Sequence, residues 1–239
     1  MSAVVERLKR AEHPVVRLAL LRLRAAPHLV ASGHAIRRRT VTQYLDSSDE
    51  PKIQIGAGPL GLSGWLNSDL ISGDIYLDLT RELRLPSGRF AYAFGEHVIE
   101  HLPERTGERL LGELHRILRP GGVVRLTTPD LNKIIAIYRD ENPVVSRDDY
   151  SRFLDETTGK RHERPCQILN DYLRLWGHQY VYDDDDLTAK LHAAGFDRVE
   201  RVEPGQSVHP ALRDLERHGG AEWVNRAEAM CLEATRAPA

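Results

Sequence analysis

Short apolar runs, most of them followed by glycine, proline or an acidic residue, recur along the chain from residue 53 onward. Runs of this length are typical of buried strands. We expect strands at residues 53–55, 65–70, 75–79, 90–94, 123–127, 198–202 and 229–235. Over residues 104–119, leucine and isoleucine recur at helical spacing, and Pro120 follows. The alternation of strands and helices predicts an α/β fold.

The connection between the first two expected strands is short. Only ten residues separate Gly58 from Asp69, whereas a strand–helix–strand unit normally takes about 30 residues. We therefore predict that the first helix is truncated to about one turn.

Residues 1–45 differ in character from the rest of the chain. Through Arg39 they contain nine lysines or arginines and only two acidic residues, with leucines and valines crowded between them. We expect an N-terminal helical extension here, followed by an α/β domain over residues 46–239. A basic amphipathic helix can cover one face of its own core, pack on a partner or rest weakly on an anionic membrane surface. The sequence leaves these alternatives open.

A long stretch, residues 130–182, follows the fifth expected strand. Connections of this length are uncommon, and near binding sites they are often lids. The stretch contains helix-like segments at residues 131–138 and 168–175, and seven of the fifteen aromatic residues of the chain. We predict an insertion that forms a lid. Some of its aromatic rings should belong to the core, and others should form a floor on which a sugar or another flat acceptor stacks.

Composition narrows the class of protein. The 239 residues carry a formal net charge of −2, so the chain lacks the basic field that drives nonspecific nucleic-acid binding, and we expect no nucleic-acid partner. No run approaches the roughly 18 apolar residues of a membrane span. Two cysteines provide neither a disulfide framework nor a metal quartet, which fits a reducing, cytoplasmic location. A homodimer is left open.

Four motifs stand in a fixed order along the chain. They are IGAG at residues 55–58, GWLNSDL at 64–70, GEHVIEHL at 95–102 and LRPGGVVRL at 118–126. This order resembles the class I S-adenosylmethionine-dependent methyltransferases, in particular a small branch often associated with glycan biosynthesis. The resemblance implies a Rossmann-like fold, a seven-stranded mixed sheet with helices on both faces, and S-adenosyl-L-methionine as the cofactor.

The carboxyl ends of the strands supply the candidate cofactor residues, because ligands of open α/β sheets bind there. The candidates are Gly56, Ala57, Gly58, Asp69, Asp78, Glu96 and His97. The glycines allow the backbone to approach a ligand closely. Asp69 can accept hydrogen bonds from both ribose hydroxyls, and the resemblance implies that Asp78 receives the adenine amine. Either aspartate could instead cap a turn.

Histidines are the candidate catalytic groups, because methylation of a hydroxyl requires a base that takes its proton. His97 follows the fourth strand, although this segment often only lines the adenosine pocket, and His101 could form a metal-binding pair with it. His178 is the preferred base. We expect Asp130 to face His178, either to orient its imidazole or to share a Mg²⁺ ion with it. The alternative is that His178 caps a turn.

These patterns predict a methyltransferase that modifies a hydroxyl group of a sugar, an oligosaccharide or a related small molecule. One alternative acceptor is a phenol or an amine of secondary metabolism. Another alternative is a non-catalytic subunit that binds the cofactor and scaffolds a partner through its N-terminal helix.

Overall fold

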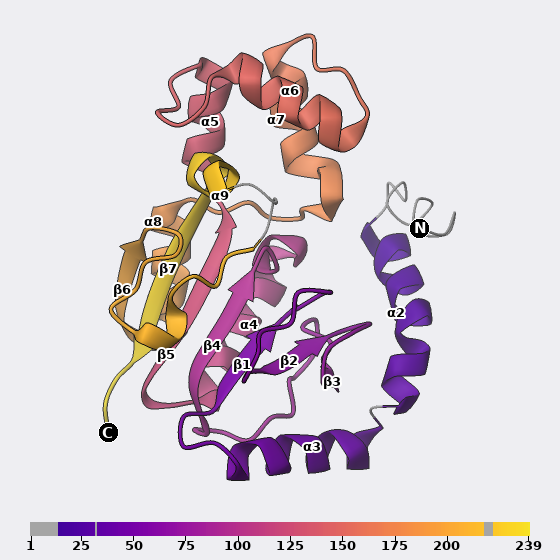
Figure 1. Cartoon of the computed structure of the whole chain (residues 1–239), viewed down its shortest axis with the longest axis vertical. Helices are drawn as coiled ribbons and strands as arrows, with labels where there is room; N and C mark the ends of the chain where they lie inside the picture. The colour runs from indigo at the N-terminus through magenta and orange to yellow at the C-terminus, as the bar shows by residue number, and fades with distance from the viewer. Residues whose placement is uncertain (1–13, 32, 218–221) are drawn as a thin grey trace.

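A seven-stranded mixed sheet forms the centre of the computed structural model, which describes residues 14–31, 33–217 and 222–239. The strand order is β3-β2-β1-β4-β5-β7-β6 (Figure 1). The strands are β1 (Lys52–Ile55), β2 (Leu66–Asp69), β3 (Ile75–Tyr76), β4 (Phe90–Glu96), β5 (Leu118–Pro129), β6 (Phe196–Val202) and β7 (Ala229–Arg236). The first five are parallel, and β7 runs antiparallel to β5 and β6. The predicted sheet is confirmed, and its order reverses at β1 and β4, where ligands of open α/β sheets bind.

Helices precede and connect these strands. The α-helices of the described residues are α2 (Pro14–Ala31), α3 (His34–Asp46), α4 (Glu104–Ile117), α5 (Leu131–Arg139), α6 (Arg147–Thr158), α7 (Pro165–Arg174), α8 (Asp184–Ala193) and α9 (Glu222–Glu228). Short 3-10 helices are η1 (Ile99–His101), η2 (Leu175–Gly177) and η3 (Pro210–Leu212). The amphipathic helix predicted over residues 104–119 is confirmed as α4. It ends at Ile117 because Leu118 already pairs with Phe90 as part of β5.

One face of the sheet is covered by helices. α4 and α8 contact each other, α4 contacts β5, and α8 contacts β6 and β7. Strand residues such as Ile53, Ala93 and Val124 join the apolar side of α4 in one buried cluster. α3 adds Val41 and Leu45 to the same cluster.

The opposite face has a cover made of loops. Phe94 and Val123, which alternate with the residues of the first face, pack with Leu62 and Trp65 of the β1–β2 connection and with Leu212 of η3. The β1–β2 connection consists of turns and bends without a helix. The truncation thus goes further than the predicted single turn. Because the connection is too short for a helix, loops take the place that helices were expected to fill on this part of the sheet.

A buried arginine of β5 anchors the loop of residues 203–217, which contains η3. Arg125 is fully buried, with its Nε 2.7 Å from Oε1 of Glu216 and its Nη1 2.6 Å from Oε1 of Glu233. It also donates a hydrogen bond of 2.8 Å to the carbonyl of Gln206. Two carboxylates and a carbonyl compensate for the burial of the guanidinium. The loop held in this way reaches the carboxyl end of β4, where the backbone N–H of Arg217 donates to Glu96.

The N-terminal extension packs on its own domain. α2 lies near the β3 edge of the sheet (Figure 1), where the guanidinium of Arg22 forms an ion pair of 2.9 Å with Asp78. Ala25 is buried, whereas Leu23 on the same helix is 72% exposed. Leu20, Leu29 and Val30 of the helix are also exposed, so packing on a partner or on a membrane surface stays a prediction; residues 1–13 lie outside the described residues. No described helix is long and apolar enough to cross a membrane.

The 130–182 stretch contains a helical cap. α5, α6 and α7 lie beyond the carboxyl end of β5 (Figure 1). Their hydrophobic cluster consists of Ile134, Ile137, Tyr150, Leu154, Ile168 and Tyr172. Tyr150 and Tyr172 are therefore core rings of the cap and take no part in the predicted stacking floor. That the cap acts as a lid stays a prediction.

Candidate functional site

The glycine turn after β1 has one crowded and one open glycine. Both have positive φ, +63° at Gly56 and +52° at Gly58. A Cβ atom at Gly56 would lie 2.5 Å from Cγ2 of Val98, whereas a Cβ at Gly58 would meet nothing within 4 Å. Between them, Ala57 is buried and its N–H donates to the carbonyl of Ser68 at 3.0 Å, which holds the turn against β2. The backbone is therefore open to a ligand at Gly58.

Asp69, the last residue of β2, stands beside this opening. Its Oδ2 accepts a hydrogen bond of 3.2 Å from the N–H of Gly58, and its Oδ1 accepts one of 2.8 Å from the N–H of Ile71. The carboxylate is half-buried and retains lone pairs beyond these two bonds. An acceptor next to an open glycine backbone fits a nucleoside, whose ribose hydroxyls are donors.

Replacing Asp69 by asparagine should weaken the binding of S-adenosylmethionine by at least about tenfold, because charge-assisted hydrogen bonds are worth about 1.5–3 kcal/mol. Asparagine retains one acceptor, for the N–H of Ile71, and its NH₂ group then faces the N–H of Gly58, so circular dichroism of the variant accompanies the titration. Asp49→Asn, at an exposed position before β1, is the matched control. Isothermal titration of both variants measures the difference, and equal affinities would mean that Asp69 does not contact the ligand.

Asp78 has partners that occupy both of its oxygens. Oδ1 accepts hydrogen bonds from the N–H and the hydroxyl of Thr80 at 3.0 and 2.6 Å, and Oδ2 binds Arg22. Burial acts to raise the pKa of Asp78, but the bonds from Thr80 and Arg22 outweigh it and lower the pKa. These contacts favour the interpretation of Asp78 as a turn cap, which also fastens α2. The adenine role stays a prediction, and it would require Asp78 to exchange Arg22 for the ligand.

Glu96 is the last residue of β4, and His97 follows it. Both carboxylate oxygens of Glu96 accept from the N–H of Arg217, at 2.8 and 3.1 Å. His97 has a φ of +49°, and its N–H donates to the carbonyl of Thr127 at 2.8 Å. Its buried ring directs Nδ1 to Oε1 of Glu100 at 3.1 Å. Burial acts to lower the pKa of His97, but the hydrogen bond and charge of Glu100 outweigh it and raise the pKa. The ring orients Glu100, and in its protonated form it has no lone pair with which to take a further proton.

Glu100 is the group at this site that our sequence reasoning missed. It is fully buried, with Oε1 facing Nδ1 of His97, and its Oε2 accepts a hydrogen bond of 3.0 Å from the hydroxyl of Thr128. Burial acts to raise the pKa of Glu100, but the hydrogen bond and charge of His97, followed by His101 and His178, lower it to about 2. The sequence signal for Glu100 is its place directly before His101 in the motif GEHVIEHL, whose histidines are candidate catalytic or metal-binding groups.

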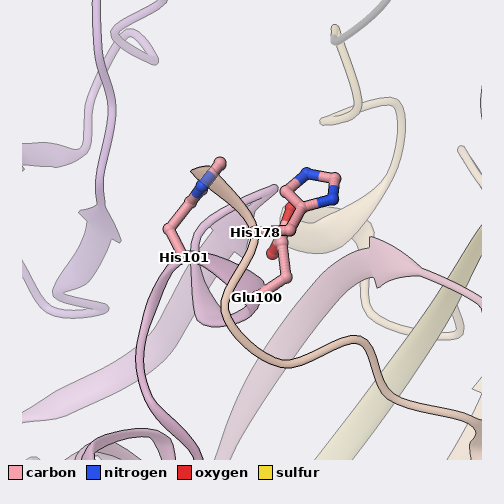
Figure 2. Close-up of side chains that lie close together, drawn as sticks. All are labelled: Glu100, His101 and His178. Atoms are coloured by element: carbon pink, nitrogen blue, oxygen red, sulfur yellow. The ribbon is translucent and has the colours of Figure 1, made fainter. Parts of the chain in front are cut away.

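His178 lies with Glu100 and His101 and does not form the predicted couple with Asp130. Its Nδ1 is 2.7 Å from the carbonyl oxygen of Tyr172, so Nδ1 carries the proton and Nε2 carries a lone pair. Burial lowers the pKa of His178 to about 4, so the ring is neutral near pH 7. The ring centroids of His101 and His178 lie 5.1 Å apart, and Figure 2 shows the two side chains with Glu100.

Asp130 has a structural role. Its Oδ1 accepts from the N–H groups of Asn132 and Lys133, at 2.9 and 3.4 Å, which caps the N-terminus of α5. Its Oδ2 pairs with Arg201 at 2.6 Å. Because a helix cap and an ion pair engage this buried carboxylate, the structure corrects both roles predicted for it, as the orienting partner of His178 and as a Mg²⁺ ligand.

One family model matches most of the chain. The model of the methyltransferase-domain family (Methyltransf_23) matches residues 30–201. Among curated proteins, no similar sequence is found. A similar solved structure is the phosphoethanolamine N-methyltransferase 2 of Haemonchus contortus with phosphomonomethylethanolamine and S-adenosylhomocysteine, at 13% identity and a TM-score of 0.46. That match covers 87% of this chain and 53% of the other, so this chain spans about half the length of that protein.

Two further solved structures are similar over most of both chains. An S-adenosylmethionine-dependent methyltransferase from Mesorhizobium loti has 18% identity and a TM-score of 0.44, covering 82% of this chain and 96% of the other. One from Archaeoglobus fulgidus has 15% identity and a TM-score of 0.46, and the match covers 84% of this chain and 91% of the other. Likeness at these identities and TM-scores carries no argument about the activity or the acceptor.

Proposed function

Because the chain belongs to the methyltransferase-domain family, we propose that it is an S-adenosylmethionine-dependent enzyme that methylates a hydroxyl group of a sugar, an oligosaccharide or a related small molecule. The open backbone at Gly58 and the carboxylate of Asp69 are the proposed holders of the cofactor. When bound, the cofactor supplies an electrophilic methyl group on a sulfonium. That methyl group passes to the acceptor oxygen as the carbon–sulfur bond breaks, and the hydroxyl loses its proton.

The observation that most supports a hydroxyl acceptor is the protonation pattern of His178. A hydroxyl becomes a good nucleophile only as its proton leaves. Nδ1 of His178 is committed to the carbonyl of Tyr172, and Nε2 has a lone pair. This lone pair can be used in two ways. It can take the proton directly, or it can bind a cation that lowers the pKa of the hydroxyl. A chelator would affect only the second.

The proposed sugar acceptor is supported by Trp176, two residues before His178. Trp176 has a φ of +59°, which is unusual for a large side chain, and such strain is often found at functional sites. Its half-buried ring lies 5.8 Å from the ring of His178. A flat indole face beside the proposed acceptor position suits stacking of a sugar ring. This is the part of the predicted aromatic floor that we retain.

Methyl transfer from labelled S-adenosylmethionine to a panel of methyl glycosides, small phenols and primary amines tests the proposal. Transfer to glycosides, together with its loss in Trp176→Ala, would support it. Transfer to phenols or amines alone would favour the alternative acceptors. Cofactor binding without transfer to any member of a broad panel would favour the scaffold subunit.

A further inference from the structure

Three side chains with metal-binding groups meet beyond the carboxyl end of β4. Glu100 and His101 are neighbours in η1, and His178 follows η2 much later in the chain. One ligand atom from each lies within 4.8 Å of the other two (Figure 2). In the described part of the chain, no other group of three His, Cys, Asp or Glu side chains meets this criterion. The three residues come from two separate segments that the fold brings together.

Neighbouring groups orient two of these side chains as outer partners orient metal ligands. Nδ1 of His178 donates to the carbonyl of Tyr172, which leaves Nε2 as the available donor atom. The buried carboxylate of Glu100 is fixed by the ring of His97 and the hydroxyl of Thr128. Metal-bound histidines characteristically donate their other ring N–H to a carbonyl or carboxylate, and metal-bound carboxylates are themselves hydrogen-bonded.

We propose that Glu100, His101 and His178 bind a divalent transition-metal ion, such as zinc, manganese, cobalt or ferrous iron. Two imidazole nitrogens and one carboxylate oxygen suit these ions, whereas Mg²⁺ prefers oxygen ligands only. The structure thereby moves the predicted metal site away from Asp130 and changes the class of ion. Three protein ligands leave a coordination position open, as in catalytic sites.

The geometry requires only a small closure. Ligand bonds of about 2.1 Å place the ligand atoms of a tetrahedral site about 3.4 Å from one another. In the structure, the ligand atoms of Glu100, His101 and His178 lie within 4.8 Å of one another. His101 is half-buried at the end of η1. A small rotation of its imidazole toward Glu100 and His178 would close the site.

The role of the ion in catalysis rests on the proposed function, although its binding does not. An acceptor hydroxyl in the open coordination position would have a lowered pKa. Its proton would pass to water, and the oxygen would take the methyl group as the carbon–sulfur bond breaks. His178 then acts as a metal ligand, which is the second of the two uses of its lone pair.

The test is a titration of the full chain with cobalt(II), after treatment with a chelator and dialysis. We expect saturable visible absorption that corresponds to one ion per chain. His101→Ala and His178→Ala should each weaken cobalt binding by more than about tenfold, since loss of an outer partner alone costs about 10–100-fold. His192→Ala is the matched control, because Nδ1 of the exposed His192 also bonds to a backbone carbonyl. His101→Ala keeps the test decisive if His178→Ala fails to fold.

Methyl transfer is measured on the same samples. Equal cobalt binding by the wild-type chain and the His101→Ala variant, or no saturable binding by the wild-type chain, overturns the metal site. Full transfer by protein that has been stripped of metal also overturns the catalytic role but keeps the proposed function. Specific cobalt binding without transfer to any acceptor confirms the metal site and rejects the proposed function.

Discussion

Replacing His178 by alanine should lower the rate of methyl transfer at saturating cofactor by at least about a hundredfold, because loss of the group that handles a nucleophile's proton typically costs about 10²–10⁴-fold. The affinity for S-adenosylmethionine should change little. The proposed place of His178 is on the acceptor side, whereas Gly58 and Asp69 are the proposed cofactor contacts. The effect should appear in kcat whether Nε2 takes the proton itself or holds the ion.

Steady-state kinetics combined with calorimetric cofactor titration checks this expectation. His192→Ala removes an imidazole that also bonds to a carbonyl, that of Phe196 at 3.0 Å, but lies on α8. It should keep its rate. A His178→Ala enzyme as fast as the His192→Ala enzyme would contradict the assignment of His178 to the transfer step.

Replacing Gly58 by valine should abolish measurable binding of S-adenosylmethionine while the fold is retained. A Cβ at Gly58 would project into space that is open within 4 Å, which is the space assigned to the ligand. The positive φ of +52° adds backbone strain, of the order of 1–2 kcal/mol for a residue with a side chain. Circular dichroism should therefore show a folded protein, and calorimetry should show no cofactor binding.

Gly88→Val is the matched control for Gly58→Val. Gly88 has a φ of +65°, and a Cβ there would also meet nothing within 4 Å. It lies just before β4, at the amino end of that strand, whereas the glycine turn follows the carboxyl end of β1. Both variants thus carry similar strain, and only Gly58→Val should lose the cofactor. Similar affinities in the two variants would show that the ligand does not approach this turn.

The positions of the strands could be predicted because local patterns determine them. Each of the seven expected runs overlaps one strand of the sheet. The largest difference is at β5, which begins at Leu118, within the segment predicted as the end of a helix. Its pairing with Phe90 is a contact across the sheet that periodicity does not report.

The cover of the second face could not be predicted, because it depends on distant partners. Arg125 lies in an apolar run and finds Glu216 and Glu233 at separations of 91 and 108 residues. The short β1–β2 connection did indicate that a helix would be nearly absent. It did not indicate that a later loop, fastened by Arg125, would fill the space.

The candidate site was predicted in part. The motif GEHVIEHL pointed to the end of β4, and His178 lies near Glu100 and His101 of this motif. The pairing of His178 with Asp130 was wrong because a local effect takes precedence: an aspartate just before an amphipathic helix caps it. The meeting of His178 with Glu100 and His101 depends on how the cap packs on the sheet, and no local pattern encodes that packing.

A crystal structure of the complex with S-adenosylhomocysteine tests the central claim most directly. We predict that the ribose hydroxyls donate to the carboxylate of Asp69, that the ligand passes beside the backbone of Gly58, and that its sulfur is directed toward the side of the site that holds Glu100 and His178. A ligand bound away from the carboxyl ends of β1, β2 and β4, or a ribose without contact to Asp69, would contradict the account.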